Sequence, residues 1–136
     1  MKFLFVDTAG WMACADGADP AHRKACAARD EWLEQEGRLL TTDYIIDETL
    51  TLLRLRLSME AAENWWHRIA VSKRLQRESI NQERAERARG IFFRYRDKLF
   101  SFTDCTSFAV MREMGLRQAL TTDTHFRQAG FQMHPR

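Results

Sequence analysis

The chain has 136 residues, of which 45% are apolar and 29% are charged, and its 21 basic and 19 acidic residues give a formal net charge of +2. This length fits one domain spanning residues 1–136, and only 6 glycines and 2 prolines exclude a collagen-like, linker-rich or disordered chain. No apolar run approaches the roughly 20 residues of a membrane-spanning helix, and the near-neutral charge argues at first sight against a dedicated nucleic-acid binder.

Short apolar runs alternate with longer amphipathic stretches along the chain. Asp19 and Pro20 begin the first amphipathic stretch and Gly37 follows it, which is typical of a helix with its caps. In chain order we predict a strand at 2–6, a helix at 21–35, a strand at 38–42, helices at 43–56 and 59–72, a weak strand at 75–80, a helix at 82–99, a loop or strand at 100–103, a helix at 104–114, a strand at 118–121 and an edge strand at 131–134. This alternation favours a parallel sheet with helices on both faces, a three-layer α/β/α domain.

The N-terminal segment and the cysteines indicate the compartment. The apolar run Phe3–Val6 stops at Asp7 and is too short for the core of a signal peptide. Cys14, Cys26 and Cys105 are odd in number and have no C-x-x-C spacing, so neither a disulfide framework nor a structural zinc site is expected. We therefore expect a cytoplasmic protein.

Three aspartates lie where parallel sheets bind ligands, at the carboxyl ends of strands. Asp7 follows the first strand, Asp123 follows the strand at 118–121, and Asp104 begins a helix. Each of them alone is more often a helix N-cap or a turn residue than a ligand, and Asp104 is the strongest capping candidate. Together they place three carboxylates on one edge of the predicted sheet.

Glu48 is the fourth acid of interest. We expect it on the apolar face of its helix, between Ile45 and Leu52, because residues three and four apart share a face. A buried carboxylate there needs an ion-pair partner or a metal. Arg54 and Arg56 are expected on other faces of the same helix, so a metal ligand and a structural ion pair stand at even odds.

Four carboxylates that converge on one edge repel one another strongly, and a divalent cation makes the arrangement favourable. Oxygen ligands without a converging His or Cys indicate Mg²⁺ or Mn²⁺ rather than Zn²⁺. Such cations keep several waters and bind substrate phosphates. The predicted chemistry is therefore metal-assisted attack of water on a phosphodiester.

Four segments carry a resemblance to a known family. They are F-V-D-T at 5–8, T-T-D-Y-I-I-D-E-T-L-T-L-L at 41–53, F-T-D-C-T-S-F-A-V-M at 102–111 and A-L-T-T-D-T-H-F-R-Q-A-G-F at 119–131. In order and spacing the set resembles the PIN-domain ribonucleases, in particular the VapC-type toxins of bacterial toxin–antitoxin pairs. The resemblance runs from the first predicted strand to the last.

The resemblance implies a PIN-like fold with a five-stranded parallel sheet and an Mg²⁺-dependent endoribonuclease activity. The acidic quartet of the family falls on Asp7, Glu48, Asp104 and Asp123. By this resemblance Asp7 and Asp104 hold the metal most directly, and Glu48 and Asp123 complete the cluster and orient the attacking water. Mn²⁺ is expected to substitute for Mg²⁺.

Hydroxyl groups and a histidine accompany the acids. The small hydroxyl residue of the family falls on Thr8, and the hydroxyl after the third acid falls on Thr106 or Ser107. Some family members carry a further acid near the fourth one, where the next residues of this chain are Thr124, His125 and Phe126. We expect His125 to be a structural residue in the packing of 126–131 in preference to a phosphate contact.

The net charge hides a basic segment. Residues 68–98 hold ten basic and four acidic residues, a local excess of six that leaves the rest of the chain acidic. A solvated helix face explains part of this excess, since Glu83 and Arg87 are a favourable i,i+4 pair. Phosphate contact explains the remainder, and the expected RNA-binding residues are Arg74, Arg77, Arg84, Arg87 and Arg94.

Partners follow from the resemblance and from two adjacent tryptophans. Trp65 and Trp66 point about 100° apart on their helix, so we expect one to be buried and the other to lie on an interaction surface. VapC-type toxins take an antitoxin segment in a groove between their third and fourth helices and form homodimers. We expect the antitoxin to bring an Arg or Lys towards the acidic cluster and so to lower its affinity for metal.

A second interpretation is a catalytically silent PIN-like module that binds RNA or protein. The chain retains all four acids and Thr8, so nothing in the sequence supports a loss of activity.

Overall fold

The computed structural model describes residues 2–136 and contains one sheet of five parallel strands in the order β3-β2-β1-β4-β5. The strands are β1 (Phe3–Val6), β2 (Arg38–Thr42), β3 (Leu75–Glu78), β4 (Gln118–Leu120) and β5 (Gln132–His134). The helices are α1 (Thr8–Ala15), α2 (His22–Glu34), α3 (Asp43–Arg56), α4 (Met59–Val71), α5 (Gln82–Arg94), α6 (Phe102–Glu113) and α7 (His125–Gln128).

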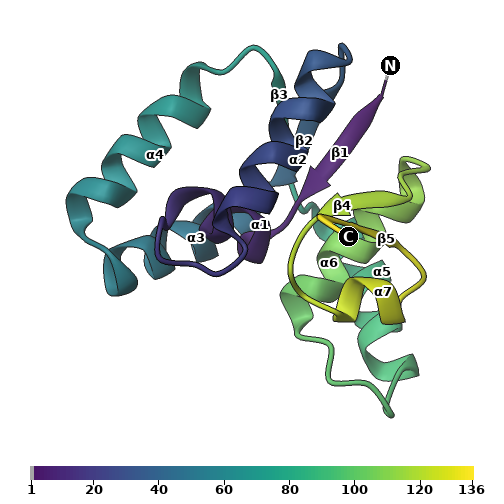
Figure 1. Ribbon diagram of the computed structural model, residues 1–136. Coiled ribbons are helices and arrows are strands. Elements are labelled where there is room, and N and C mark those ends of the chain that lie inside the picture. The colour runs from purple at the N-terminus through teal and green to yellow at the C-terminus, as the bar shows by residue number, and fades with distance from the viewer. Residues whose placement is uncertain (1) are drawn as a thin grey trace.

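The sheet is the middle one of three layers. Helices α1 to α4 lie on one face of the sheet and α5 to α7 on the other (Figure 1). On the first face α1 packs against α2 and α3, and α3 packs against α4, while on the second face α6 packs against α5 and α7. The predicted three-layer α/β/α architecture with five parallel strands is confirmed.

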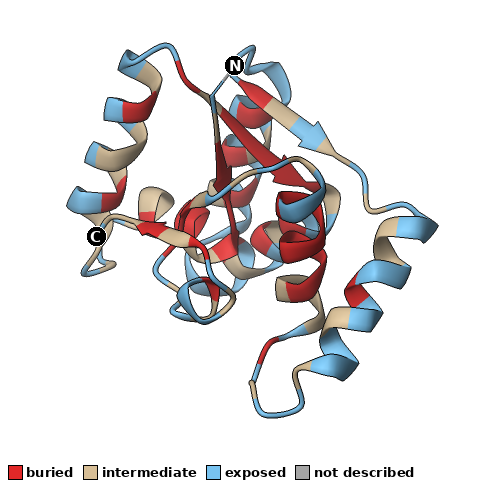
Figure 2. Cartoon of the chain, turned by 90° about the vertical axis from the view of Figure 1, so that its right-hand side faces the viewer, coloured by how far each residue is buried: buried red, intermediate tan, exposed pale blue. Residues whose placement is uncertain are grey.

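The central strand and an aromatic cluster form the heart of the core. Leu4, Phe5 and Val6 of β1 are completely buried, because helices cover both faces of a parallel sheet. On the α6 face the rings of Phe108 and Phe126 pack edge to face with centroids 5.0 Å apart. Figure 2 shows the buried residues gathered on the central strands and on the sides of the helices that face them.

The strand order reverses at β1. From β1 the chain proceeds through β2 to β3 on one side, and it then returns to form β4 on the other side of β1. Val6 of β1 pairs with Leu120 of β4, so the next residues, Asp7 and Thr121, leave the sheet side by side. A reversal of this kind leaves a crevice at the carboxyl ends of the strands, where open α/β sheets bind their ligands.

Helix α1, which begins directly after β1, was not predicted. Asp7 is its N-cap and accepts a hydrogen bond from the backbone N–H of Gly10 at 2.8 Å. Gly10 is required for close approach, since a Cβ there would lie 2.0 Å from the carbonyl oxygen of Leu120. The absence of a side chain thus lets the first turn of α1 sit against the end of β4.

The second half of the chain differs from the prediction at helix ends. The helix predicted at 82–99 ends at Arg94, and the rings of Tyr95 and Phe100 pack 5.9 Å apart where the chain turns back. No strand forms at 100–103, because Ser101 caps α6, which begins two residues earlier than predicted. The short helix α7 was also unpredicted, and a single turn carries no periodic signal.

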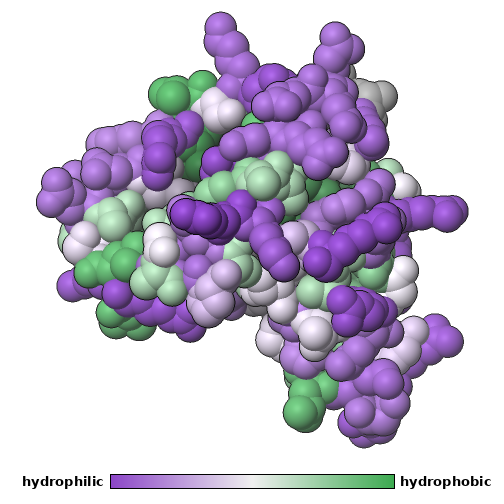
Figure 3. Space-filling view, in the orientation of Figure 1, coloured by the Kyte–Doolittle hydropathy of each residue, from purple (hydrophilic) through white to green (hydrophobic). Residues whose placement is uncertain are grey.

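The surface in Figure 3 is mostly hydrophilic, with apolar patches over α3 and α4 and at the tip of the α5–α6 connection. Trp65 is buried and meets Trp11 edge to face, with ring centroids 5.5 Å apart. Trp66 is half-buried and carries the guanidinium of Arg77 over its ring. The two tryptophans therefore divide between core and surface, as expected. None of the described helices is both long and apolar enough to cross a membrane.

Candidate active site

A cleft of about 350 Å³ opens at the carboxyl ends of β1 and β4. Its lining includes all four predicted acids, which come from four separate parts of the chain: Asp7, Glu48, Asp104 and Asp123. Asp7 follows β1, Glu48 lies on α3, Asp104 lies in the first turn of α6, and Asp123 follows β4. The expected convergence at one sheet edge is what the structure shows.

Asp7 lies at the floor of the cleft with 4% of its surface exposed. Its Oδ1 accepts the N–H of Gly10, and its Oδ2 accepts the hydroxyl of Thr121 at 2.7 Å. Burial raises the pKa of the Asp7 carboxyl to about 7; the two hydrogen bonds oppose this rise, and the charges of Asp123 and Asp104 add to it. An ionised Asp7 is therefore costly unless a cation lies beside it.

Asp104 takes part in the capping box of α6 and also lines the cleft. Its backbone N–H donates to the hydroxyl of Ser101 at 3.0 Å, and its Oδ2 accepts the N–H of Ser101 at 3.1 Å, which makes a capping box. The expected N-cap role of Asp104 is therefore wrong, because Ser101 is the N-cap and Asp104 completes the capping box from the third position of the helix. Burial raises the pKa of the Asp104 carboxyl, and the nearby charge of Asp123 raises it further. Capping does not remove this side chain from the cleft.

Asp123 is held by the turn that follows β4. Its backbone N–H donates to the hydroxyl of Thr121 at 2.9 Å, and its Oδ1 accepts the N–H of His125 at 2.9 Å. Thr121 therefore connects Asp123 to Asp7 through one hydroxyl group. The turn role that was considered for Asp123 is real, and it orients the carboxylate towards the other acids.

The prediction that Glu48 is buried was wrong. Glu48 is exposed at the mouth of the cleft, although Ile45 and Leu52 on the same helix face line the cleft with it. The buried face of α3 runs through Ile45, Thr49 and Leu53 into the core, and Glu48 stands beside this face on the side that lines the cleft. Arg56 lies two turns further along this side and also lines the cleft, so its assignment to another face was wrong as well.

Of the three hydroxyl residues predicted for the site, only one lines the cleft. Thr8 lines the cleft, and its buried Oγ1 has no hydrogen-bond partner among residues 2–136. Thr106 and Ser107 are completely buried outside the cleft lining. The hydroxyl of Thr106 donates to the carbonyl oxygen of Thr103 at 2.6 Å. Thr8 is therefore the hydroxyl available to a ligand in the cleft.

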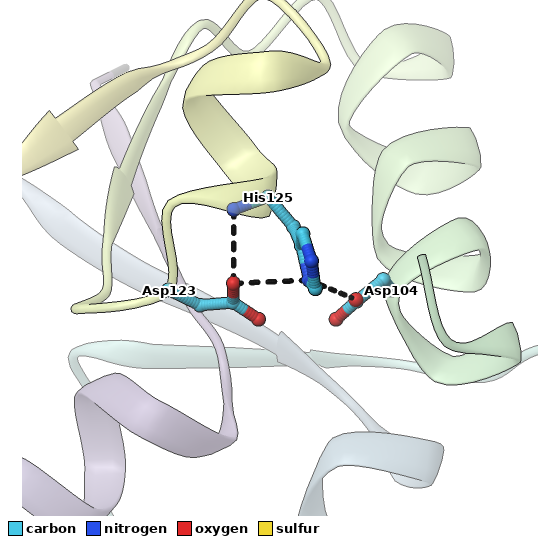
Figure 4. Close-up of side chains that lie close together, drawn as sticks. All are labelled: Asp104, Asp123 and His125. Carbon is cyan, nitrogen blue, oxygen red and sulfur yellow. Dashed lines mark hydrogen bonds and ion pairs between the residues drawn. The ribbon is translucent and has the colours of Figure 1, made fainter. Parts of the chain in front are cut away.

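His125 was expected to be structural, and it also faces the acids. Its ring packs edge to face on Phe100, with centroids 5.6 Å apart. Its Nδ1 lies 3.1 Å from Asp123 Oδ1 and 3.3 Å from Asp104 Oδ2 (Figure 4). These three side chains offer ligand atoms that lie within 4.8 Å of one another. Sequence reasoning underrated His125 because an aromatic packing partner was a sufficient explanation for it.

Two of the arginines expected to bind RNA, Arg84 and Arg87, form ion pairs within the protein. Arg84 forms ion pairs with Glu78 at 2.8 Å and with Glu113 at 2.7 Å. Arg87 pairs with Glu113 and with Glu83, each at 2.8 Å. The predicted i,i+4 pair is present, and the network connects α5 to α6 and to the end of β3.

The other three arginines also have partners. Arg74 donates to the carbonyl oxygen of Leu33 in α2 and to that of Gly37, just before β2. The guanidinium groups of Arg77 and Arg94 lie over the rings of Trp66 and Tyr95. The lining of the cleft contains none of the five arginines among the described residues. Their contact with RNA stays a prediction, and Arg56 is the arginine that the structure places in the cleft.

Comparisons with known proteins agree with this geometry. A family model described as PIN domain matches residues 4–132. The 23S rRNA-specific endonuclease VapC20 of Mycobacterium tuberculosis, from the strains CDC 1551 / Oshkosh and H37Rv, is 33% identical over 128 residues, which cover 94% of this chain and 95% of the relative.

Solved structures give the same result. The crystal structure of M. tuberculosis VapC20, described as a Sarcin-Ricin loop cleaving toxin, matches with a TM-score of 0.84 over 94% of this chain and 95% of that one. FitAcB from Neisseria gonorrhoeae matches with a TM-score of 0.69 over 96% of both chains, and at 15% identity it shows the fold alone. The chain therefore belongs to the PIN-domain family, whose members are nucleases that act on RNA, and within that family to the VapC-type toxins.

Proposed function

We propose that this chain is an Mg²⁺-dependent endoribonuclease, with Mn²⁺ able to substitute, and that it acts in the cytoplasm as the toxin of a toxin–antitoxin pair. The observation that carries the proposal is the meeting of four acids from four elements in one cleft at the strand-order reversal. Burial raises the pKa of Asp7 and Asp104, the charges of neighbouring acids add to this rise, and the ionised cluster is unfavourable unless a cation neutralises it.

The groups in the cleft fit a hard divalent cation. Asp7, Glu48, Asp104 and Asp123 offer the carboxylate oxygens that Mg²⁺ prefers. The buried Oγ1 of Thr8, without a hydrogen-bond partner in the described part of the chain, adds a neutral oxygen. No lysine lines the cleft within residues 2–136, so no lysine competes with a cation for these carboxylates.

Each residue has a place in this proposal. Asp7 and Asp104 hold the cation most directly, and hydrogen bonds from Gly10, Thr121 and Ser101 fix the orientation of their carboxylates. When bound, the cation supplies positive charge to the phosphate oxygens and lowers the pKa of a coordinated water.

The remaining acids and Arg56 complete the site. Asp123 is held by the turn after β4, and Glu48 lies at the mouth; we assign them the orientation of the attacking water and the acceptance of its proton. Arg56 shares the mouth with Glu48 and supplies a positive charge that can hold an RNA phosphate against the acidic floor.

The comparisons support a structured ribosomal RNA as substrate. The relative at 33% identity, VapC20, is a 23S rRNA-specific endonuclease and is described as a Sarcin-Ricin loop cleaving toxin. We therefore propose that this chain cuts a phosphodiester in an exposed loop of a large ribosomal RNA. An unpaired loop suits an open cleft, because its backbone can be splayed away from the helical stem.

Cleavage of a short stem-loop RNA with the sarcin–ricin sequence tests this proposal. We expect purified protein to cut the loop at one position in Mg²⁺ or Mn²⁺, to stop on addition of EDTA and to resume on restoration of Mg²⁺. A stem-loop with the same stem and a scrambled loop is the matched control. Binding of the RNA without cleavage in either metal would contradict the proposal and favour the silent binding module.

A second, larger groove fits the antitoxin. It has a volume of about 790 Å³ and runs between α3 and α4 to the end of β3. Apolar side chains, including Leu50, Met59 and Trp66, lie in it beside Asp43 and Asp47. We propose that an amphipathic antitoxin segment with basic residues binds here and extends an Arg or Lys to the acidic cleft. A homodimer is proposed on the resemblance to VapC-type toxins.

A further inference from the structure

His125 Nδ1 has no hydrogen bond among the described residues although it is buried and lies beside two carboxylates. Packing on Phe100 explains the position of the ring but not the placement of this nitrogen against Asp104 and Asp123. In the tautomer that carries its lone pair on Nδ1, this nitrogen is repelled by the two carboxylate oxygens it faces. A cation between the three atoms removes this repulsion and satisfies the nitrogen.

The spacing of the three atoms matches a coordination sphere. Nδ1 of His125 lies 3.1 Å from Asp123 Oδ1 and 3.3 Å from Asp104 Oδ2. Adjacent ligands of an octahedral ion with bonds of roughly 2.1–2.2 Å lie about 3.0 Å apart, and tetrahedral ligands lie somewhat farther apart. These two separations fall in this range, and the ligand atoms of all three side chains lie within 4.8 Å of one another. Figure 4 shows the three side chains pointing towards one another.

A second observation at the same cleft also points to a ligand. Thr8 is 7% exposed, and its Oγ1 is buried without a hydrogen-bond partner within residues 2–136. Both Thr8 and His125 line the cleft. Two buried polar atoms from separate elements therefore lack a hydrogen bond within residues 2–136 beside the same acids.

An imidazole changes which cation the acids prefer. Mg²⁺ takes oxygen ligands almost exclusively, whereas Mn²⁺, Fe²⁺, Co²⁺ and Zn²⁺ accept imidazole nitrogen readily. On the proposed function, which this inference deepens and on which it rests, we infer that His125 is a nitrogen ligand that makes the centre bind first-row transition cations more tightly than Mg²⁺. Mg²⁺ binds the same acids with water in place of the imidazole.

Mn²⁺ is the probe for this inference, because its electron spin echo reports directly bound nitrogen. We expect a ¹⁴N modulation from wild-type protein loaded with one equivalent of Mn²⁺ and none from His125→Gln. Calorimetric titration of the same proteins should show a fall in Mn²⁺ affinity of roughly tenfold or more in His125→Gln, since even outer partners of metal ligands contribute 10–100-fold. Mg²⁺ affinity should change by less than roughly twofold, because water replaces the imidazole.

His67→Gln is the matched control, because His67 is exposed on α4 and outside the cleft. It should keep both the modulation and the Mn²⁺ affinity. The His125 main-chain N–H, which holds Asp123, is unaffected by the side-chain change, so His125→Gln should still bind Mg²⁺ and melt normally in EDTA.

The outcomes separate this inference from the proposed function. Mn²⁺ bound without nitrogen modulation in the wild type, or with equal affinity in His125→Gln, overturns the role of His125 while Mg²⁺-dependent RNA cleavage stands. Failure of the wild type to bind either cation, together with no cleavage of RNA, overturns both.

Discussion

Replacement of Asp7 by Asn is expected to lower the rate of RNA cleavage by at least roughly a thousandfold, about 4 kcal/mol of transition-state stabilisation. The amide keeps the size of the side chain and can still accept the N–H of Gly10, but it removes the negative charge at the floor of the cleft. Single-turnover cleavage in saturating Mg²⁺ measures the loss of chemistry separately from RNA binding. Asp30→Asn, on the exposed face of α2, is the matched control and should cleave normally.

The same substitution is expected to stabilise the metal-free protein at high pH. Burial raises the pKa of Asp7 from 3.8 to about 7, so the folded protein holds a proton that the unfolded chain releases. Wild-type stability should therefore fall as the pH rises from about 4 to about 7, by about 4 kcal/mol in total. Asp7→Asn removes this fall and should be the more stable protein at pH 8 in EDTA.

Denaturant unfolding of both proteins at pH 5 and pH 8 in EDTA measures this difference. Asp30→Asn, a change at an exposed surface ion pair, should follow the wild type at both pH values. A wild-type stability that is the same at pH 5 and pH 8, or an Asp7→Asn protein that cleaves RNA at the wild-type rate, would contradict the role given to Asp7.

The second large effect is expected at Gly10. A Cβ there would lie 2.0 Å from the carbonyl oxygen and 2.8 Å from the carbonyl carbon of Leu120, and backbone atoms cannot rotate away as side-chain ends can. Gly10→Ala must therefore push α1 off β4 and should reduce the free energy of unfolding by about 3 kcal/mol or more. Thermal unfolding should shift down by roughly 10 °C or more.

Gly90 provides the opposite control. It lies inside α5, and a Cβ there would have no heavy atom within 4 Å. Gly90→Ala should stabilise the protein by about 1 kcal/mol, because alanine is the better helix former. If Gly10→Ala proved as stable as the wild type, the close approach of α1 to β4, and with it the spacing of Asp7 and Asp123, would be wrong.

The fold could be predicted largely from hydrophobic runs and caps. Continuous apolar runs such as 3–6 predict buried parallel strands, and long amphipathic stretches predict the covering helices. Helix α1 was not predicted because it has only eight residues and contains Gly10. The close approach of Gly10 to Leu120, which requires a glycine there, is visible only in the three-dimensional structure. Tertiary contacts of this kind carry no local signal.

The site could be predicted in part. Asp7 and Asp123 follow strands, and sheet topology brings such positions together whatever the details of packing. The exposure of Glu48 depends on the cleft that opens beside the buried face of α3, and periodicity alone does not reveal that cleft. Arg56 did carry a signal, since it stands four residues after Leu52 and eight after Glu48 on the same face.

The basic segment shows the limit of counting charges. Its excess of positive charge over residues 68–98 favoured RNA contact, yet Arg84 and Arg87 are engaged in ion pairs with acids of the protein, among them Glu113 of α6. One of these acids, Glu113, lies outside the segment, and its pKa is lowered chiefly by its hydrogen bond from Arg84. The net charge of one segment does not account for acidic residues from other segments that form ion pairs with it in the folded protein.

The central claim is that the four acids form one divalent-cation site, and anomalous scattering from crystals soaked in Mn²⁺ tests it most directly. The claim predicts an anomalous peak in the cleft, bonded to oxygens of Asp7 and Asp104, and its loss in Asp7→Asn crystals soaked in the same way. A cleft without a peak at saturating Mn²⁺, or a peak bonded to neither aspartate, would contradict it.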